Sequence, residues 1–424
     1  MPSELLEALR AQPGGEQLLT VAREGVYLVG GAVRDLLRGE TPRELDVVVE
    51  AGAGEEDEGE GLLAGLGGEA HVHDRFGTAT VTVGGTRVDV ARARRERYPA
   101  PGALPEVEPA GLREDLRRRD FTVNAIALAL AGPRAGELSA VEHAREDLRA
   151  GLLRVLHDGS FIDDPTRLWR LGRYRARTGF EIEEHTAQLA AQALAGEALD
   201  TVSRARVGAE LRLALGEPDP VAALQSLREL GVLAALEERL GFDARLAASA
   251  LDLLAEAAAS SPGAPLRPDL LLLGVMFRPM GADVLEEGVE LAMYELLDGM
   301  GFPGTDRERV LRMAICADAM ADELAHAEES SEIYEAVSHE SLEGVALAGA
   351  WDESGWSDAW GSAHRWLTQL RHVNLQITGD DLIAAGIPEG PEIGRRLEAA
   401  LCAKLDEQLD DGRAAELAAA LRVR

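Results

Sequence analysis

The stretch VYLVGGAVRD, residues 26–35, decides the fold at the start of this chain. Four residues typical of a buried strand lead into Gly30 and Gly31, and the run behind them predicts a helix. Glycine lets the backbone come close to a ligand, and the exposed N–H groups at a helix start favour phosphate. The stretch therefore predicts a strand, a tight turn and a helix that together form a phosphate cradle.

A second strand, ELDVVV at residues 44–49, carries two acidic side chains. Side chains two residues apart on a strand point the same way, so Glu44 and Asp46 share one face. Two carboxylates beside a phosphate cradle are what a pair of Mg²⁺ ions needs, which indicates nucleotidyl transfer. The alternative is an ordinary turn followed by a solvated acidic strand end, and the spacing of these groups together with Arg34 and Asp35 disfavours it.

The length and composition of the chain limit its class. At 424 residues it is too long for one core, so two to four domains are expected. It is 46% hydrophobic but only 4% aromatic, and the dominance of Leu and Ala favours extensive helix. No apolar run reaches the roughly 18–20 residues that span a bilayer, and residues 1–10 lack a signal-peptide layout. Cys316 and Cys402 form no disulfide or metal framework, so a cytoplasmic location is expected.

The charge of the chain is strongly negative but unevenly distributed. A net charge of −32 repels a polyanion at long range. Arginines nevertheless concentrate at residues 92–97, 113–119 and 167–177. A local basic seam on an acidic protein remains compatible with RNA binding.

The pattern along the chain predicts an α+β fold, with a small mixed sheet followed by an elongated all-helical part. Apolar residues recur at helical spacing almost throughout after residue 132. The Pro/Gly-rich segment 98–109 interrupts the early pattern and is expected to be a mobile loop. Gly84 and Gly85 predict a hairpin turn between two of the strands. The expected strands are residues 27–29, 45–49, 79–83 and 87–91.

Further residues that can do chemistry follow the first two strands. Asp89 lies on the strand expected beside Glu44 and Asp46, although it can also be an ordinary hairpin-edge residue. The motif RRRDFTVN, residues 117–124, crowds three like charges that a polyanionic ligand would relieve. The alternative for this motif alone is a solvated basic turn.

The segment DDPTRLWRLGR, residues 163–173, predicts a helix with Pro165 in its first turn. Spacings of three place Asp164, Arg167, Arg170 and Arg173 along one helix face. An Asp acceptor beside an Arg donor fork matches the polar edge of a base, and further arginines can hold triphosphate charge. The alternative is a simple surface ion pair between Asp164 and Arg167.

Two other features suggest different functions. His157 and Asp158 resemble the His-Asp pair of a metal phosphohydrolase, which would need more His and Asp ligands on neighbouring helices. Tryptophans near the C-terminus can stack on RNA bases, but core packing is the better interpretation. They are Trp351, Trp356, Trp360 and Trp366.

Together these motifs resemble the class II tRNA nucleotidyltransferase and bacterial poly(A) polymerase family. The likeness covers residues 20–215, about half the chain, and RRDFTVNA at 118–125 is its most diagnostic part. A weaker similarity lies at residues 378–394. The other matching segments are LVGGAVRD at 28–35, Glu44 with Asp46, FGTA at 76–79 leading to Asp89, the helix from Asp163, and SRARVGAEL at 203–211.

The resemblance implies a seahorse-like enzyme that adds CCA, or part of it, to tRNA 3′ ends. CTP and ATP would be its substrates, Mg²⁺ its cofactor and pyrophosphate its by-product, with no membrane and no protein partner. The implied segments are a catalytic head at 1–131, a nucleotide-recognising neck at 132–215, a body at 216–330 and a tRNA-binding tail at 331–424, the last two holding the acceptor arm.

The resemblance also implies roles for individual residues. Glu44 and Asp46 would bind Mg²⁺, with Asp89 as a third ligand and the base for the primer 3′-hydroxyl. Asp164 and Arg167 would select the nucleotide. The implied nucleotide-binding residues are Gly30, Gly31, Arg34, Arg119, Asp120, Asn124, Asp164, Arg167, Arg170 and Arg173.

The chain departs from the family pattern at the first acid, where Glu44 stands in place of the usual Asp. One extra methylene displaces the carboxylate, and Mg²⁺ geometry is strict, so reduced or altered activity is a possible outcome. Asp163 also replaces a common Glu, which leaves Asp164 and Arg167 intact. A-only addition, CC-only addition, poly(A) synthesis and a catalytically idle RNA-binding protein remain alternatives. The arginine-rich loop at residues 92–108 disfavours CC-only addition.

Overall fold

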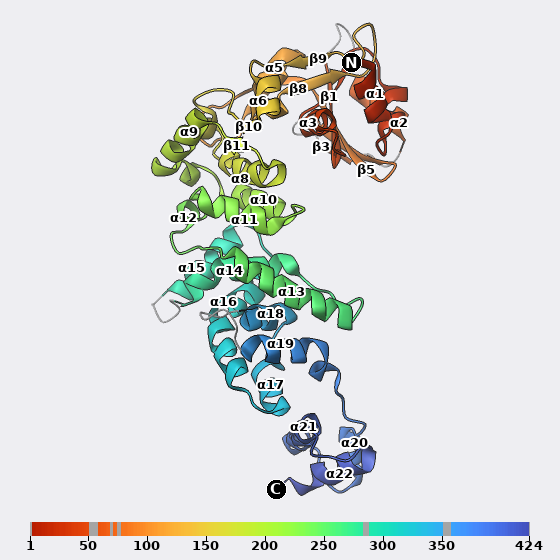
Figure 1. Cartoon of the computed structure of the whole chain (residues 1–424), viewed down its shortest axis with the longest axis vertical. Coiled ribbons are helices and arrows are strands. Elements are labelled where there is room, and N and C mark those ends of the chain that lie inside the picture. Colours follow the sequence, from red (N-terminus) through yellow and green to blue (C-terminus); the bar gives the residue numbers. More distant parts are fainter. Residues whose placement is uncertain are drawn as a thin grey trace. The chain divides into compact units, whose positions relative to one another are not determined.

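The computed structural model describes residues 2–50, 58–67, 71–73, 78–282, 288–350 and 358–423. Phe76, Gly77, Trp351 and Trp356 lie outside the described residues. The chain divides into two compact units, Met1–Ser203 and Arg204–Arg424. Figure 1 draws the first unit in red to yellow-green and the second in green to blue. The finer division into head, neck, body and tail stays a prediction.

A seven-stranded sheet organises the first unit, and the mixed sheet that the sequence predicts is confirmed. Neighbouring strands are antiparallel except for the central pair β2 and β5, which run parallel. Gly84 and Gly85, both at positive φ, form the predicted turn between β4 and β5. In sheet order the strands are β3 (His71–His73), β4 (Thr78–Val83), β5 (Thr86–Arg92), β2 (Glu44–Val49), β1 (Val26–Val29), β8 (Ile126–Ala129) and β9 (Leu138–Ala140).

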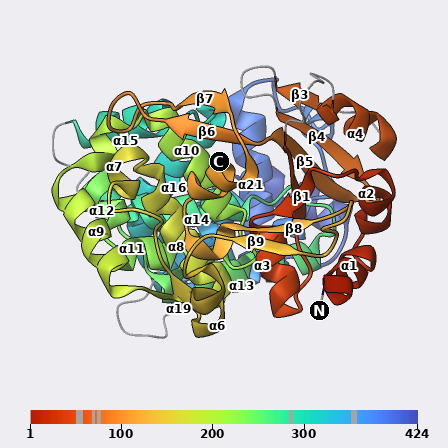
Figure 2. The same ribbon diagram turned by 90° about the horizontal axis from the view of Figure 1, so that it is seen from above.

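One face of the sheet is covered by the helices α1 (Pro2–Arg10), α2 (Gly15–Val21), α3 (Gly31–Arg38) and α4 (Glu58–Leu66). Figure 2 shows α1, α2 and α4 beside the strands on this side. Leu45 and Val47 of β2 point into the core beneath these helices. Because strand residues alternate between faces, Glu44 and Asp46 point to the opposite face.

The opposite face is covered in part by α5 (Leu112–Arg117). Leu112 and Leu116 of this helix pack on Tyr27, Val29 and Val48. The helix therefore covers one portion of the face and leaves the acidic side chains of β2 beside it. Arg118 and Arg119 follow this helix directly, and the helix brings them close to Asp46.

The segment expected as a mobile loop at residues 98–109 is partly a two-stranded ribbon. Strands β6 (Arg94–Arg97) and β7 (Glu106–Pro109) pair antiparallel and enclose the Pro/Gly-rich residues 98–105. The alternating charges explain the pairing, since Arg95 bonds Glu108 directly across the ribbon. The prediction missed these strands because they contain few apolar residues.

The rest of the first unit is mainly helical. The predicted helix from Asp163 is interrupted, because Asp164 precedes Pro165 and adopts a non-helical conformation at φ −135°. Asp164 therefore lies between two helices and not on one face with the arginines, which corrects the prediction. The elements here are η1 (Thr122–Asn124), α6 (Ala144–Ala150), β10 (Leu152–Leu153), α7 (Ser160–Asp163), α8 (Thr166–Thr178), β11 (Glu181–Ile182), α9 (Glu184–Ala195) and η2 (Ala198–Thr201).

The second unit is all-helical over its described residues, as the periodicity predicts. A small separate core, containing Ile377, Leu382, Ala400 and Ala420, holds the last helices together. The elements are α10 (Arg204–Leu215), α11 (Pro220–Glu229), α12 (Val232–Leu236), α13 (Ala244–Ser260), α14 (Pro268–Ala282), α15 (Val289–Gly299), α16 (Gly304–His326), α17 (Ser330–Val337), α18 (Leu342–Ala350), α19 (Asp358–Thr368), η3 (Leu370–His372), α20 (Gly379–Ala384), α21 (Pro391–Leu405) and α22 (Arg413–Arg422).

The two described tryptophans of the C-terminal region behave differently. Trp366 is buried, in agreement with the core interpretation, whereas Trp360 is 41% exposed and stacks on His364. Among the described helices, none combines the length and the apolar composition that crossing a membrane would require.

Candidate active site

Asp46 and Asp89 lie directly opposite each other on the parallel strands β2 and β5. Both line a cavity of about 320 Å³ together with Thr80, Arg118 and Arg119. Glu44 lies two residues before Asp46, exposed at the start of β2 and outside the residues that line the cavity. The strand register therefore brings two of the three predicted carboxylates together, with the third on the same face of β2.

The pKa of Asp46 reflects its burial and the carboxylates near it. Burial raises the pKa of Asp46 to about 6, and the negative charges of Glu44 and Asp89 add to this rise. Arg119 opposes the rise. Removing a charged carboxylate from water and placing it near like charges both disfavour its ionised form. A cation at this position would relieve that cost.

Asp89 is oriented by two neighbours. Thr80 of β4 donates a hydrogen bond to Asp89 Oδ1, and Arg87 Nη2 lies 2.9 Å from Asp89 Oδ2. The three residues come from paired strands, so the hairpin fixes the carboxylate relative to Asp46.

The glycine turn faces the carboxylate of Asp46. Gly30 adopts φ +71°, a conformation that other residues rarely take. A Cβ atom at Gly30 would lie 2.9 Å from Arg119 Nη1 and 3.5 Å from Asp46 Oδ2. Gly31 begins α3 immediately after it. The turn, the arginine and the acid therefore converge as the sequence predicts.

A chain of hydrogen bonds joins α3, η1 and α8. Arg34 Nη1 donates to Asn124 Oδ1 at 2.8 Å, and Asn124 Nδ2 donates to Asp120 Oδ1 at 3.1 Å. Arg170 Nε and Nη2 donate to Asp120 Oδ2 at 2.8 and 2.6 Å. Burial favours the neutral form of Asp120, but Arg170 and the hydrogen bonds outweigh it and lower the pKa to about 2. Four predicted residues are thus one connected network.

The remaining predicted residues lie in α8 or directly before it. Asp164 Oδ1 accepts hydrogen bonds from Thr166 N and Oγ1, at 3.1 and 2.6 Å. The buried Arg167 donates to Ser160 Oγ at 2.7 Å and to the carbonyl oxygen of Arg118 at 2.8 Å. Arg173 is also buried. The bond to the Arg118 backbone fixes Arg167 relative to the arginines beside the cavity, and the bonds from Thr166 fix Asp164 at the start of α8.

Asp115 is a residue that the sequence reasoning missed. This fully buried carboxylate accepts hydrogen bonds from Arg118 Nε at 2.8 Å and Arg119 Nη2 at 3.0 Å. The repulsion expected within residues 117–119 is therefore relieved internally for two of the three arginines. The spacings of three and four residues from Asp115 were a signal that could have revealed this pairing.

Tyr174 is a second missed residue. The centroid of its ring lies 5.5 to 5.7 Å from the guanidinium carbons of four arginines, and the ring packs nearly perpendicular to that of Phe121. The sequence signal available for Tyr174 was its position among the arginines of residues 167–177. The four arginines are Arg34, Arg170, Arg173 and Arg177.

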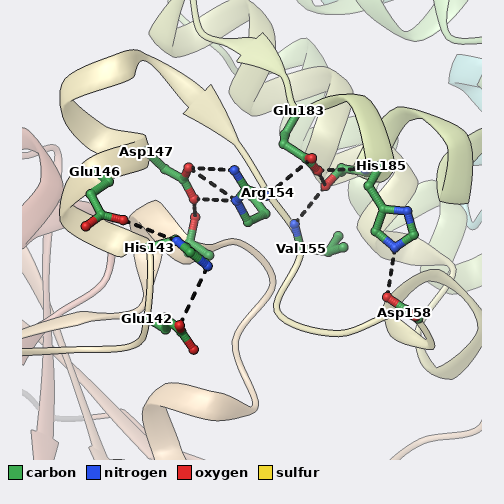
Figure 3. Close-up of polar contacts among 11 residues, drawn as sticks. Glu142, His143, Glu146, Asp147, Arg154, Val155, Asp158, Glu183 and His185 are labelled. Carbon is green, nitrogen blue, oxygen red and sulfur yellow. Dashed lines mark hydrogen bonds and ion pairs between the residues drawn. The ribbon is translucent and has the colours of Figure 1, made fainter.

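A third missed group of residues contacts the RRDFTVN segment at Thr122. Thr122 donates to Asp147 at 2.7 Å, and Arg154 lies between Asp147 and Glu183, as Figure 3 shows. Glu183 also caps α9 by accepting from Thr186 N. The group joins α6, β10 and the start of α9, and no local pattern in the sequence announces such distant partners.

The described residues contain no group of three His, Cys, Asp or Glu side chains placed to hold a metal ion. The phosphohydrolase alternative required such a group; His157 lies 4.0 Å from Asp163, and His185 bonds Asp158. Mg²⁺ differs, because it is usually held by one or two carboxylates together with substrate phosphates. The acidic pair Glu44 and Asp46 fits that donor set.

The raised pKa of Asp46 predicts a pH-dependent stability effect in metal-free protein. Between the unfolded pKa of 3.8 and the folded value of about 6, the native state retains a proton that the unfolded chain has lost. Charging Asp46 in the folded protein therefore lowers the free energy of unfolding by about 3 kcal/mol. This cost is nearly absent below pH 4 and almost complete above pH 6. We expect Asp46→Asn to raise the melting temperature in EDTA at pH 8 and to leave it unchanged at pH 4. An equal change at both pH values would contradict this assignment.

Comparison with known proteins is consistent with this geometry. Residues 26–154 match the family described as the Poly A polymerase head domain. Residues 179–239 match the family described as the probable RNA and SrmB-binding site of polymerase A. The first match contains the whole carboxylate cavity and the glycine turn.

Curated relatives of this chain are named as tRNA nucleotidyltransferases. The A-adding tRNA nucleotidyltransferase of Geobacter sulfurreducens is 35% identical over 405 residues, 90% of this chain and 43% of that protein. The CC-adding tRNA nucleotidyltransferase of Deinococcus radiodurans is 46% identical over 205 residues, 47% of this chain and 52% of that protein. The chain thus spans about half the length of these curated relatives.

A solved structure is similar over nearly the whole chain. The Thermotoga maritima CCA-adding enzyme complexed with tRNA is 27% identical, with a TM-score of 0.79, and the match covers 99% of this chain and 97% of that one. The sequence motifs, the cavity and these likenesses agree, and the chain belongs to the class II tRNA nucleotidyltransferase and bacterial poly(A) polymerase family.

Proposed function

We infer that this protein extends tRNA 3′ ends with nucleotides of the CCA sequence, using CTP and ATP without a nucleic-acid template. The observation that carries this inference is the cavity in which Asp46 faces Asp89, Arg119 and the Gly30 turn. Carboxylates opposite a phosphate-binding turn suit the attack of a 3′-hydroxyl on an α-phosphate with loss of pyrophosphate. The names of the relatives support the choice of tRNA and of these nucleotides.

In this proposal the residues around the cavity have separate roles. The backbone at Gly30 and Gly31 and the cations Arg34 and Arg119 hold the triphosphate. Glu44 and Asp46 hold Mg²⁺, which when bound lowers the pKa of the 3′-hydroxyl and stabilises charge on the leaving pyrophosphate. Asp89, which Thr80 and Arg87 hold in position, is assigned as the acceptor of the hydroxyl proton.

Selection of the nucleotide is assigned to the start of α8. Asp164 offers an acceptor and Arg167 a donor fork to the edge of cytosine or adenine. Their hydrogen bonds to Thr166, Ser160 and the Arg118 backbone hold them in position. Arg170, Arg173, Asp120 and Asn124 complete the proposed nucleotide-binding residues, and Arg170 and Asn124 both donate to Asp120.

The test is nucleotide incorporation into defined RNA substrates. Purified protein is incubated with Mg²⁺ and labelled CTP or ATP, on tRNA that ends at the discriminator base and on tRNA that ends in CC. Complete CCA addition predicts CTP incorporation on the first substrate and ATP incorporation on the second. Long adenylate runs on arbitrary RNA would indicate a poly(A) polymerase. No incorporation with any divalent ion would leave only RNA binding and overturn the proposal.

A-only addition is the second candidate, because the Geobacter relative that matches 90% of this chain carries that name. It predicts that ATP is added to tRNA ending in CC and that CTP is not incorporated on either substrate. The same experiment therefore separates the two candidates.

Glu44 provides a prediction within the proposed mechanism. Its extra methylene adds a rotatable bond to an exposed metal ligand, so the carboxylate is held less firmly than a shorter one would be. We expect Glu44→Asp to raise kcat with Mg²⁺ by about tenfold, since small misplacements in active sites have effects of this size. The measurement is single-turnover incorporation with Mg²⁺ and with Mn²⁺. A lower rate in the variant would show that the surrounding strand is adapted to glutamate.

A further inference from the structure

A second cavity, of about 590 Å³, lies in the first unit and shares no lining residue with the carboxylate cavity. Helix α5 and the residues after it separate the two, since Arg117 lines the second cavity and Arg118 the first. The remaining walls come from Thr122, from residues 140–143 at the end of β9 and after it, and from residues 154–157 after β10, which Figure 3 shows around Arg154 and Val155.

The walls of this second cavity are cationic. Arg113 and Arg117 line it, one turn apart on the same side of α5. Among the described residues, neither side chain has a hydrogen bond or ion-pair partner, and both are exposed. Glu142 is the one carboxylate among the lining residues. Its side chain is 89% exposed, and its Oε1 lies 3.9 Å from His143 Nε2.

Other charges near the second cavity are already compensated. Arg154 is neutralised by Asp147 at 2.9 Å and Glu183 at 3.2 Å. Burial and the nearby Arg167 lower the pKa of His157, so this histidine is neutral near pH 7 and can offer a ring N–H. The uncompensated charge therefore belongs to Arg113 and Arg117.

Arg113 and Arg117 differ from the arginines that follow them in the chain. The chain has 75 acidic residues against 43 basic ones, and the neighbouring Arg118 and Arg119 share the buried Asp115. Two like charges one turn apart repel each other. An anion in the cavity removes this repulsion and gains charge-assisted hydrogen bonds from both guanidinium groups.

The size of the site favours a polymer over a free nucleotide. A third cavity, of about 860 Å³, adjoins the second and shares Arg113, Leu116 and residues 140–143 with it. The two cavities together are much larger than one phosphate group, and Glu50 and Glu146 line only the third, which leaves the positive charge of the second cavity at Arg113 and Arg117. We propose that Arg113 and Arg117 bind backbone phosphates of the RNA strand, at a site separate from the nucleotide-binding cavity. This inference rests on the proposed function for the identity of the RNA.

The test compares two double variants with equal loss of charge. Arg113→Gln with Arg117→Gln removes the proposed contacts. Arg23→Gln with Arg149→Gln is the matched control, because both arginines are exposed, line none of the three cavities, and have no side-chain partner among the described residues. Binding of tRNA is measured against KCl concentration, and KM is measured separately for tRNA and for ATP and CTP.

We expect the Arg113/Arg117 variant to bind tRNA roughly tenfold more weakly and to lose about 1.4 from the slope of log affinity against log salt, as for two phosphate contacts to a single strand. Its kcat and its KM for nucleotides stay unchanged. Equal weakening in the control variant, or unchanged tRNA binding, would overturn the inference. A higher KM for nucleotides alone would show that the site takes triphosphate instead. Wild-type protein that binds tRNA without adding nucleotides would refute the proposed function and leave this binding test valid.

Discussion

Asp46→Asn should lower the rate of nucleotide addition by about 10³-fold while leaving tRNA affinity within twofold of wild type. The substitution keeps the shape of the side chain and removes the charge that faces Arg119 and the Gly30 turn. Charge stabilisation of several kcal/mol at a metal-assisted transition state corresponds to a rate change of this size. Single-turnover incorporation and filter binding measure the two quantities.

Glu137→Gln is the matched control for Asp46→Asn. It makes the same carboxylate-to-amide change at an exposed residue that pairs with Arg134 on the surface. The control should incorporate nucleotides at the wild-type rate. If Asp46→Asn retained more than a tenth of the wild-type rate, Asp46 would not be a metal ligand and the assignment of the cavity would fail.

Asp120→Ala should reduce the free energy of unfolding by about 3 kcal/mol, because removing one partner of a buried ion pair leaves the other charge uncompensated. Asp120 is 5% exposed and accepts hydrogen bonds from Arg170, Asn124 and the Phe121 backbone. The folded pKa of Asp120 is below its unfolded value, so this stability is present above pH 4 and is lost as pH falls toward 2. Denaturant unfolding at pH 7 and at pH 3 checks both the size and the direction.

The control for Asp120→Ala is Glu16→Ala. Glu16 pairs with Arg10 at 2.7 Å, and both side chains are more than half exposed. Surface pairs of this kind contribute about 0–1 kcal/mol, so the control should unfold almost as the wild type does. Equal destabilisation in the two variants would mean that Asp120 and Arg170 are no more tightly coupled than a surface pair.

The sequence predicted those parts of the site that depend on local periodicity. Alternation along a strand placed Glu44 and Asp46 on one face, and the paired glycines at 84 and 85 gave the turn that returns Asp89 to the sheet. The convergence of the Gly30 turn with Asp46 also followed from the pattern of residues 26–50. Each of these inferences needed only neighbours within a few residues.

The parts that the sequence did not reveal depend on distant contacts. Asp147, Arg154 and Glu183 meet because α6, β10 and α9 pack together, and no spacing in the chain encodes that meeting. The break before α8 was readable in principle, since Pro165 restricts Asp164, but the arginine periodicity suggested one continuous helix. Tyr174 was missed because its four arginine neighbours include Arg34, which is far away in sequence.

The parallel pairing of β2 with β5 has a consequence for how this protein can change over evolution. Strand β5 is held between two partners whose registers place Asp89 beside both Asp46 and Thr80. Inserting or deleting a single residue at the bend between β4 and β5 would turn Asp89 toward the apolar side and present Val88 or Val90 in its place. Descendants of this chain are thus constrained in the number of residues at that bend, and the positive φ of Gly84 and Gly85 restricts their replacement as well.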